Sequence, residues 1–408
     1  MLRLIFILFA AFIGIYINIW FFILILEKRL RLFSKKNAKK LPKVSILIPA
    51  YNEAEYISNT LDSVLALDYP KKKMEIIVID NGSTDGTSGM VSKYKDVKLL
   101  RMKNPGKADA LNLGLKHATG EVIGFLDADT SVSKDCLKKM VGYFDDHKVG
   151  VITTLIKTDV NKGFLSKMQY IEYIFSALSK KLISLLNSMY VTQGTLALTR
   201  KDLLQEIGFS SDTLTEDMDL ALSIRKKGFK IVNCMDAVTY TRIPRNIKEL
   251  FKQRVRWYRG FIENTKKHSD IFFNKNIPHL GWFILPMSFL AIFVGIILFF
   301  SLAFDVIFNF FIATESAPYL AINDQIKVLL NHMDIKNHLF LGPHYTIFFV
   351  LIFFTSFFIL TYALKIMLSI SFINLIQLPI YMIIYYFFIM IIWIYAFILE
   401  VLGCKKRW

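Results

Sequence analysis

Hydrophobic and polar positions follow two different patterns along this chain. Near its ends, uncharged apolar stretches of twenty residues or more occur at Leu4–Leu26, Leu280–Phe304 and Tyr345–Leu364. Each is long enough to cross the ~30 Å hydrocarbon core of a bilayer as a helix. Between about residues 43 and 245, apolar runs are short and alternate with polar stretches of helical periodicity. The pattern therefore predicts a water-exposed middle part flanked by membrane-spanning helices.

A last uncharged stretch, Ile366–Leu399, is too long for one straight crossing. Pro379 is expected to divide it, because proline disfavours helix in the residues before it. Residues 366–378 carry three polar side chains at i,i+3 spacing, as in a helix that lies in the membrane interface: Ser371, Asn374 and Gln377. Residues 380–399 are then the fourth predicted span, and four spans place both termini on the same side.

A dense basic cluster follows the first span. Eight Lys and Arg residues lie between Lys28 and Lys43, which places this flank in the cytoplasm by the positive-inside rule. We expect the first span to be a retained anchor, because it is too long for a cleaved leader and no small-residue cleavage site follows it. The basic tail Lys405–Arg407 would then lie outside, against the same rule, so the side of the C-terminus stays open.

Composition narrows the class of partner. Of the 408 residues, 54% are hydrophobic and only 20% are charged, with a formal net charge of +17. Such a balance is typical of proteins that meet nucleic acids or anionic membrane surfaces. No aromatic residues are regularly interleaved with the basic cluster, so we expect a lipid bilayer and no nucleic acid as partner. The three cysteines form no CxxC pair and indicate neither a zinc site nor a disulfide framework.

The middle part is predicted to alternate between strands and helices. Short apolar runs bounded by turn residues indicate buried strands at Val44–Ile48, Glu75–Ile79, Val97–Leu100 and Val122–Leu126. Between them, helices are expected at Glu55–Leu67, Asp85–Tyr94 and Ala108–Ala118. This alternation predicts an open parallel sheet with helices on both faces, in which ligands bind at the carboxyl ends of the strands.

Polar and acidic residues follow three of the predicted strands. The first strand is followed by Pro49–Glu53, the second by Asp80–Gly86 and the fourth by Asp127-Ala128-Asp129. Asp and Asn also form ordinary turns and helix caps, so one such end would carry little weight. Two carboxylates at i,i+2 beyond a buried strand can hold a hard divalent cation and leave positions for phosphate and water.

Two later motifs have both a structural and a chemical interpretation. Leu214–Asp217 opens a helical stretch that runs to Lys227. Its acidic residues either stabilise the helix through its dipole or take part in catalysis. Asn246–His268 is a predicted helix, and the i,i+3 and i,i+4 spacing places three polar or aromatic residues on one face: Gln253, Arg256 and Trp257. An arginine beside an aromatic suits a pyrophosphate and a sugar ring, and equally suits an interfacial anchor.

Taken in order, these motifs resemble those of the membrane-embedded family 2 glycosyltransferases, the processive synthases of the cellulose, hyaluronan, chitin and poly-N-acetylglucosamine type. The matching segments are PAYNE, IVIDNGSTDGT, NPGKADALN, DAD, TED and QRVRW, over about residues 41–265. The resemblance implies an α/β fold of the GT-A-like class, with an open, mostly parallel sheet, about four transmembrane helices and amphipathic interface helices.

The resemblance implies a nucleotide pocket built from four side chains. Tyr51 would stack on the uracil, Glu53 and Asp80 would hold the nucleoside, and Lys107 would be the basic contact to the nucleotide.

It also implies a metal site and a base. Asp127 would contact the sugar nucleotide and, with Asp129, ligate the Mg²⁺ or Mn²⁺ that bridges the two phosphates. Asp217 matches the family's general base, with Glu216 beside it in the catalytic group.

Acceptor residues follow in the same way. Gln253, Arg256 and Trp257 match the QxxRW motif, which closes over the diphosphate and the acceptor end. Gly194 and Thr195 lie in a segment where cellulose synthases carry a Cys-containing loop that touches the acceptor sugar; the cysteine is absent here, which leaves the acceptor open. An apolar stripe from Phe164 to Met189 is typical of a core or coiled-coil face, and in this family of an interface helix.

The resulting layout has four parts. We expect an N-terminal anchor over 1–27, a cytoplasmic glycosyltransferase domain over 41–245 and an interface helix with QRVRW over 246–279. The C-terminal membrane region follows over 280–408, with spans near 280–304, 345–364 and 380–399 and an interface helix over 366–378.

The implied function is inverting, metal-dependent, processive transfer from a nucleotide sugar, a UDP-linked hexose or N-acetylhexosamine. The polysaccharide would be elongated at the cytoplasmic face of the plasma membrane and extruded, with a homo-oligomer or an accessory subunit considered as completing a narrow channel. Two alternatives stay open, namely a non-processive transferase that adds one sugar to a polyprenyl phosphate or lipid, and an inactive membrane scaffold or transport subunit. The intact DAD, TED and QRVRW motifs disfavour the scaffold.

Overall fold

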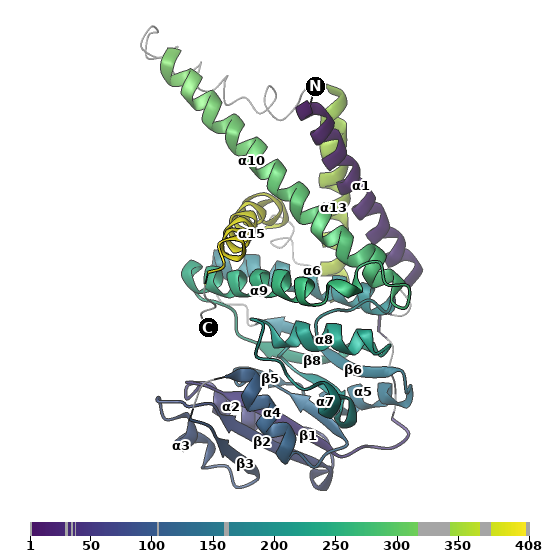
Figure 1. The fold of residues 1–408 in the computed structure, drawn as a ribbon, viewed down its shortest axis with the longest axis vertical. Coiled ribbons are helices and arrows are strands. Elements are labelled where there is room, and N and C mark those ends of the chain that lie inside the picture. Colours follow the sequence, from purple (N-terminus) through teal and green to yellow (C-terminus); the bar gives the residue numbers. More distant parts are fainter. Residues whose placement is uncertain are drawn as a thin grey trace. The chain divides into compact units, whose positions relative to one another are not determined.

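The computed structural model describes residues 2–28, 32–33, 36, 38–103, 106–158, 163–316, 343–367 and 377–404. The chain divides into two compact units, both drawn in Figure 1. The helical unit contains residues 1–26 and 287–394, and the sheet unit contains residues 27–286 and 395–408.

The helical unit is made of long apolar helices, α1 (Leu2–Lys28), α10 (Leu285–Ser316), α13 (Pro343–Met367) and α15 (Tyr386–Val401). Among the described residues, three helices have the length and composition to cross a membrane: Leu8–Lys28, His279–Phe300 and Gln377–Val401. A shorter apolar helix, Val350–Lys365, overlaps the remaining predicted span, Tyr345–Leu364. Pro379 lies in the helical segment Gln377–Val401, close to the first described residue of that segment. Most of the predicted interface helix over 366–378 and the tail 405–407 lie outside the described residues.

Within the helical unit, α1 and α13 pack closely. A Cβ atom on Gly14 would lie 3.1 Å from the Cδ1 of Ile352, so the small residue allows close approach. One turn further along, Ser356 Oγ donates to Asn18 Oδ1 at 3.1 Å. The four-residue spacing of these positions on α1 places them on one face, which therefore forms the contact with α13.

The sheet unit is built on an eight-stranded sheet in the order β3-β2-β1-β4-β7-β6-β8-β5. The four predicted strands are confirmed and run parallel to one another: β1 (Val44–Ala50), β2 (Met74–Asp80), β3 (Val97–Arg101) and β4 (Val122–Phe125). Four further strands follow, namely β5 (Thr130–Val132), β6 (Val149–Thr158), β7 (Ala197–Arg200) and β8 (Lys230–Thr241). Because β7 is antiparallel to β4 and β6, and β5 is antiparallel to β8, the sheet as a whole is mixed.

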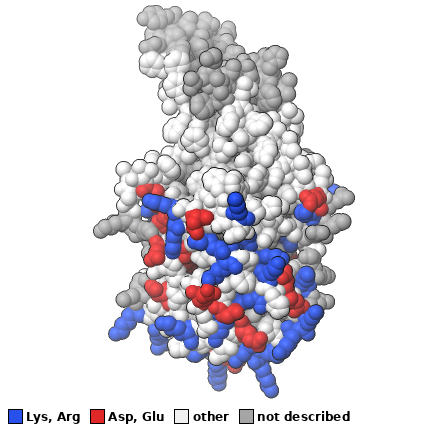
Figure 2. Space-filling view, turned by 45° about the vertical axis from the view of Figure 1, so that its right-hand side comes forward, with Lys and Arg blue, Asp and Glu red and all other residues white. Residues whose placement is uncertain are grey.

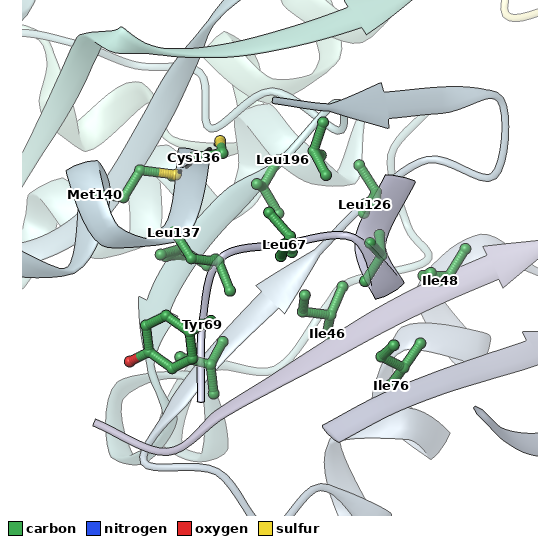
Figure 3. Close-up of a cluster of buried hydrophobic side chains, with 14 of the residues drawn as sticks. Ile46, Ile48, Leu67, Tyr69, Ile76, Leu126, Cys136, Leu137, Met140 and Leu196 are labelled. Carbon is green, nitrogen blue, oxygen red and sulfur yellow. Dashed lines mark hydrogen bonds between the residues drawn. The ribbon is translucent and has the colours of Figure 1, made fainter. Parts of the chain in front are cut away.

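Helices cover both faces of this sheet, as predicted. Successive residues of a strand point to opposite faces, so Ile46 and Ile48 pack into one core and Leu47 into the other. The first core, shown in Figure 3, includes Leu137 of α5. It is covered by α2 (Ile57–Leu65), α3 (Thr87–Val91) and α5 (Cys136–Val141), and the second core by α4 (Lys107–His117), α7 (Lys201–Ile207) and α8 (Glu216–Lys226). This double covering fixes the strand ends that carry the motifs.

Two longer amphipathic helices complete the sheet unit, α6 (Phe164–Leu185) and α9 (Ile247–Lys267). Helix α6 packs on β6 and β8 and buries part of the predicted apolar stripe, including Met168 and Leu178. Its assignment as a membrane-interface helix stays a prediction. Helix α9 begins after Asn246, whose Oδ1 accepts from the N–H of Glu249 at 2.9 Å, an N-cap that ends the preceding loop. Figure 2 shows charged side chains gathered on the sheet unit, in keeping with its water-exposed surface.

Candidate active site

The loops after β1 and β2 are joined to each other by hydrogen bonds. Asn52 adopts a left-handed backbone conformation, with φ of 55°, and its Oδ1 accepts from the N–H of Thr84 at 2.8 Å. The N–H of Glu53 donates to Thr87 Oγ1 at 2.9 Å, so the two loops are held at two points. The Tyr51 side chain beside them is 49% exposed. An exposed aromatic face on a fixed loop is available for stacking on a base.

Asp80, at the end of β2, shapes this loop. Its Oδ1 accepts from the N–H of Ser83 at 2.9 Å, and its Oδ2 accepts from the hydroxyl of Ser88. Burial opposes ionisation, yet these hydrogen bonds hold the pKa of Asp80 below its ordinary value. Asp80 is therefore a carboxylate with an internal role, and its contact with a nucleoside stays a prediction.

Lys107, at the start of α4, joins two motifs that lie far apart in the sequence. Its Nζ lies 2.8 Å from Oδ1 of Asp127 in the DAD motif and 2.9 Å from Oε1 of Glu216 in the TED motif. Burial disfavours the ammonium, but the two carboxylates raise the pKa of Lys107 above its ordinary value. The lysine therefore stays charged and holds the two motifs together.

An acidic cluster lies beside this lysine, formed by Glu53, Asp127 and Asp129. Burial and the charge of Asp129 raise the pKa of Glu53 to about 7. Burial and the charge of Asp127 likewise raise the pKa of Asp129. Carboxylates that repel one another in this way are stabilised by a cation, and hard oxygen donors suit Mg²⁺ or Mn²⁺. Within the described residues no three His, Cys, Asp or Glu side chains enclose a metal position, so an ion here would take part of its ligands from a bound phosphate.

Asp217 lies in the first turn of α8, close to the lysine. Burial and the neighbouring Glu216 raise the pKa of Asp217 to about 6, against the positive charges of Lys107 and Arg256. A carboxylate with a pKa near neutrality has the basicity that general-base chemistry needs. The next acid on the helix, Asp219, is engaged elsewhere, because its Oδ1 lies 2.8 Å from Nε2 of His268.

The loop before β7 connects the DAD and TED motifs from the other side. The carbonyl of Gly194 accepts from the N–H of Asp127 at 2.9 Å, and a Cβ on Gly194 would lie 2.5 Å from that residue's Oδ2. A larger residue at this position would have to displace the Asp127 carboxylate. Thr192 Oγ1 donates to the carbonyl oxygen of Asp217 at 2.8 Å. In the described structure the buried hydroxyl of Thr195 has no hydrogen-bond partner.

The same loop contacts a half-buried lysine that the sequence did not point out. Gln193 has a left-handed backbone, with φ of 57°, and its carboxamide oxygen accepts from Nζ of Lys180 at 2.8 Å. Its amide nitrogen donates to the carbonyl of Thr154 at 3.2 Å. Burial lowers the pKa of Lys180 to about 8, while the charge of Asp217 opposes that shift. Lys180 is one of several polar residues of this amphipathic helix, so the sequence carried no specific signal for it.

The QRVRW segment on α9 is anchored through Arg254. This side chain is fully buried, and its Nη2 lies 2.7 Å from Oε2 of Glu172 on α6. Its guanidinium carbon lies 4.1 Å from the centre of the Trp257 ring, a cation–π contact. Arg254 also donates to the side chain of Gln253. Arg254 therefore orients Trp257, although it was not among the three residues predicted to share a face of this helix. Arg256, which was among them, acts through its charge on the pKa of Asp217.

The second half of α9 holds the start of the TED motif. A Cβ on Gly260 would lie 2.3 Å from Thr215 Oγ1, so helix and loop are in direct contact. Asn264 Nδ2 donates to the Thr215 carbonyl at 3.1 Å and to its Oγ1 at 2.9 Å. Glu263 Oε2 accepts from the N–H of Leu214 at 2.9 Å. The QRVRW and TED motifs are thus attached to one helix.

One cation near the acidic cluster was missed by the sequence reasoning. The guanidinium carbon of Arg242, directly after β8, lies 3.6 Å from the centre of the Tyr56 ring. Its charge acts to lower the pKa of both Glu53 and Asp129. Its position after a strand was a signal, but its closeness to the acids depends on the pairing of β5 with β8.

Comparison with known proteins gives a consistent result. Residues 45–208 match the family described as Glycosyl transferase family 2. The chain is similar to poly-beta-1,6-N-acetyl-D-glucosamine synthase of Staphylococcus epidermidis, with 32% identity over 281 residues, 64% of this chain and 68% of that protein. It is also similar to the synthase of the same name from Staphylococcus aureus (strain COL), with 34% identity over 231 residues, 55% of this chain and 56% of that protein.

A solved structure resembles the fold. The mannosyltransferase PcManGT from Pyrobaculum calidifontis, in complex with GDP-Man and Mn²⁺, has a TM-score of 0.53 and 21% sequence identity, over 88% of this chain and 98% of that one. At this identity the likeness concerns the fold alone. Together with the family match it confirms the GT-A-like class, with a mixed sheet.

Proposed function

Because the chain belongs to the family 2 glycosyltransferases and has helices long and apolar enough to cross a membrane, we propose that it is a polysaccharide synthase that transfers N-acetylhexosamine from a UDP-sugar. The observation that carries the proposal is the arrangement around Lys107. This lysine joins the DAD carboxylate of Asp127 to Glu216, next to a carboxylate, Asp217, with a pKa of about 6. The relatives named as poly-N-acetylglucosamine synthases support the choice of sugar.

The nucleotide side of the reaction is assigned to the loops after β1 and β2. Tyr51 offers an exposed ring for the uracil, and Glu53 and Asp80 lie at the same strand ends. Asp127 and Asp129 would hold Mg²⁺ or Mn²⁺, which supplies positive charge to the departing diphosphate when it is bound. Lys107 and Arg256 add positive charge from the protein.

The acceptor side is assigned to Asp217. Its carboxylate would take the proton from the acceptor hydroxyl while that oxygen bonds to the anomeric carbon. In the same displacement the bond from the anomeric carbon to the diphosphate oxygen breaks, UDP leaves, and the anomeric configuration is inverted. No covalent intermediate with the protein is needed. Trp257, oriented by Arg254, and the loop with Gly194 and Thr195 are the proposed contacts of the acceptor sugars.

The proposed layout keeps the four parts expected from the sequence, with the catalytic unit in the cytoplasm behind the Lys28–Lys43 cluster. Extrusion would then proceed through membrane helices, completed by a second copy or an accessory subunit. An aromatic side chain against a sugar ring suits a polymer that stays bound between additions, which supports processivity.

The test uses the full-length protein in detergent or nanodiscs with a panel of radiolabelled nucleotide sugars. We expect UDP-N-acetylglucosamine to give a polymer ladder on a sizing gel, and Asp217→Asn to give none. A single lipid-linked product would establish the non-processive alternative. Absence of any product from every nucleotide sugar, with UDP binding also absent, would favour the inactive scaffold.

A further inference from the structure

Arg242 occupies a defined place opposite the DAD motif. Strands β5 and β8 pair antiparallel, with Thr130 opposite Thr241, and the two threonine hydroxyls lie 3.3 Å apart. Asp129 directly precedes β5, and Arg242 directly follows β8. Continuing the register of the two strands places the second aspartate of the motif next to this arginine, and the charge of Arg242 acts on Asp129.

The guanidinium of Arg242 is held in place but not neutralised. It stacks 3.6 Å from the centre of the Tyr56 ring, on the segment that follows Glu53. Across the described residues it makes no hydrogen bond and no ion pair within 4.0 Å, although its charge is felt by Glu53 and Asp129. Its five N–H donors are therefore available beside the acidic cluster.

Two other cations of the site have donors in use, and a third, Arg256, acts on Asp217 at the start of α8. Lys107 is bonded to Asp127 and Glu216, and Arg254 is bonded to Glu172. A planar guanidinium with open donors is the group that proteins use for bidentate contacts with phosphate. A diphosphate that enters with its cation at Asp129 would bring phosphate oxygens next to Arg242.

We propose that Arg242 binds the diphosphate of the nucleotide sugar, at the Asp129 end of the acidic cluster, while Lys107 serves the Asp127 end. The proposal rests on the proposed function, because it needs a nucleotide diphosphate as ligand. Tyr56 is the positioning residue that holds the guanidinium in the correct plane. Arg242 thus adds a protein cation to the leaving group that the QRVRW motif and the metal site do not account for.

The experiment measures binding of UDP and of uridine to the full-length protein by titration calorimetry with Mn²⁺ present. Arg242→Gln should weaken UDP binding about 10- to 100-fold, the range expected for lost hydrogen bonds to a charged group. Uridine binding should be unchanged, because uridine has no phosphate. Arg242→Lys keeps the positive charge but loses the planar guanidinium that can bind phosphate through two N–H groups. Its UDP affinity should lie between those of the wild type and Arg242→Gln.

The matched control is Arg245→Gln. Arg245 lies three residues further on, its side chain is 61% exposed, and it reaches the Tyr56 hydroxyl only at 3.5 Å. UDP binding should stay within about twofold of wild type, as for most surface substitutions.

Three outcomes would overturn the assignment. Equal UDP binding by wild type and Arg242→Gln would remove Arg242 from the diphosphate site and leave the proposed function intact. Parallel loss of UDP and uridine binding, in both Arg242→Gln and Arg242→Lys, would show that the residue only supports the loop around Tyr56. Failure of the wild-type protein to bind UDP would overturn the proposed function and this assignment together.

Discussion

Asp217→Asn gives the sharpest test of the proposed chemistry. The substitution keeps the size of the side chain and the hydrogen bond that Asp217 Oδ1 accepts from the N–H of Met218 at 2.8 Å. It removes the basicity together with the negative charge. Nucleotide-sugar binding should therefore survive, whereas turnover should fall by about 10² to 10⁴, the usual contribution of a general base.

The structure also sets the pH at which the base is lost. Burial and the charge of Glu216 raise the pKa of Asp217 to about 6, above the ordinary aspartate value of 3.8. A base works only when it is deprotonated, so kcat/KM should rise with pH through about 6 and level off above about 7. One pH unit below the pKa only about a tenth of the protein carries the active carboxylate, so the rate at pH 5 should be about a tenth of the plateau.

A second variant tests why the pKa of Asp217 is raised. Glu216→Gln removes the negative charge that disfavours ionisation of Asp217, so the acidic limb of the profile should move to lower pH. Asp212→Asn, an exposed acid whose side chain is 79% accessible, is the control and should leave the limb in place.

The assay is the release of UDP as a function of pH, with UDP affinity measured in parallel. Turnover of Asp217→Asn within about tenfold of wild type would refute the assignment of the base. An acidic limb that stays at the same pH in Glu216→Gln would refute its electrostatic explanation.

Three further predictions follow from the same geometry. Asp129→Asn should abolish transfer without rescue by added Mn²⁺, and EDTA should stop the wild type; full turnover in EDTA would contradict the metal site. Gly260→Ala places a methyl group 2.3 Å from Thr215 Oγ1 and should reduce turnover by more than about tenfold, with a lower Tm, because overpacking costs ~1–3 kcal/mol. Its control is Gly89→Ala, which meets open space and should behave as wild type. Trp257→Ala should shorten the polymer while UDP binding is kept, and long polymer from a stable variant would remove the acceptor role.

The sequence predicted the first half of the sheet more completely than the second. Strands β1 to β4 are apolar runs bounded by turn residues, and they were located together with the motifs at their ends. Strand β5 has three residues and β7 has four, which is too short for a period-two pattern to be visible. Strand β8 carries Asn233 and Asp236 within its apolar residues, which obscured it. The second half of the sheet, in which β6 and β8 pair in parallel and the other pairs are antiparallel, was not foreseen.

Among the site residues, too, those specified by local sequence could be predicted and those that depend on distant contacts could not. Motifs that lie directly at a strand end, such as Asp80 and Asp127, could be named because local sequence specifies them. The contacts of Arg242 with Tyr56 and of Lys180 with Gln193 join positions with no local relation. They depend on strand pairing and helix packing, which no spacing rule in a single sequence encodes.

The contact between Gly260 and Thr215 has a consequence for the proposed base. Helix α9 has 21 residues and therefore spans about 31 Å, at about 1.5 Å per residue. Because Thr215 lies directly against Gly260, a shift of the helix at this point would be passed to the TED motif and to Asp217. Contacts made anywhere along the helix could therefore alter the position of the proposed base.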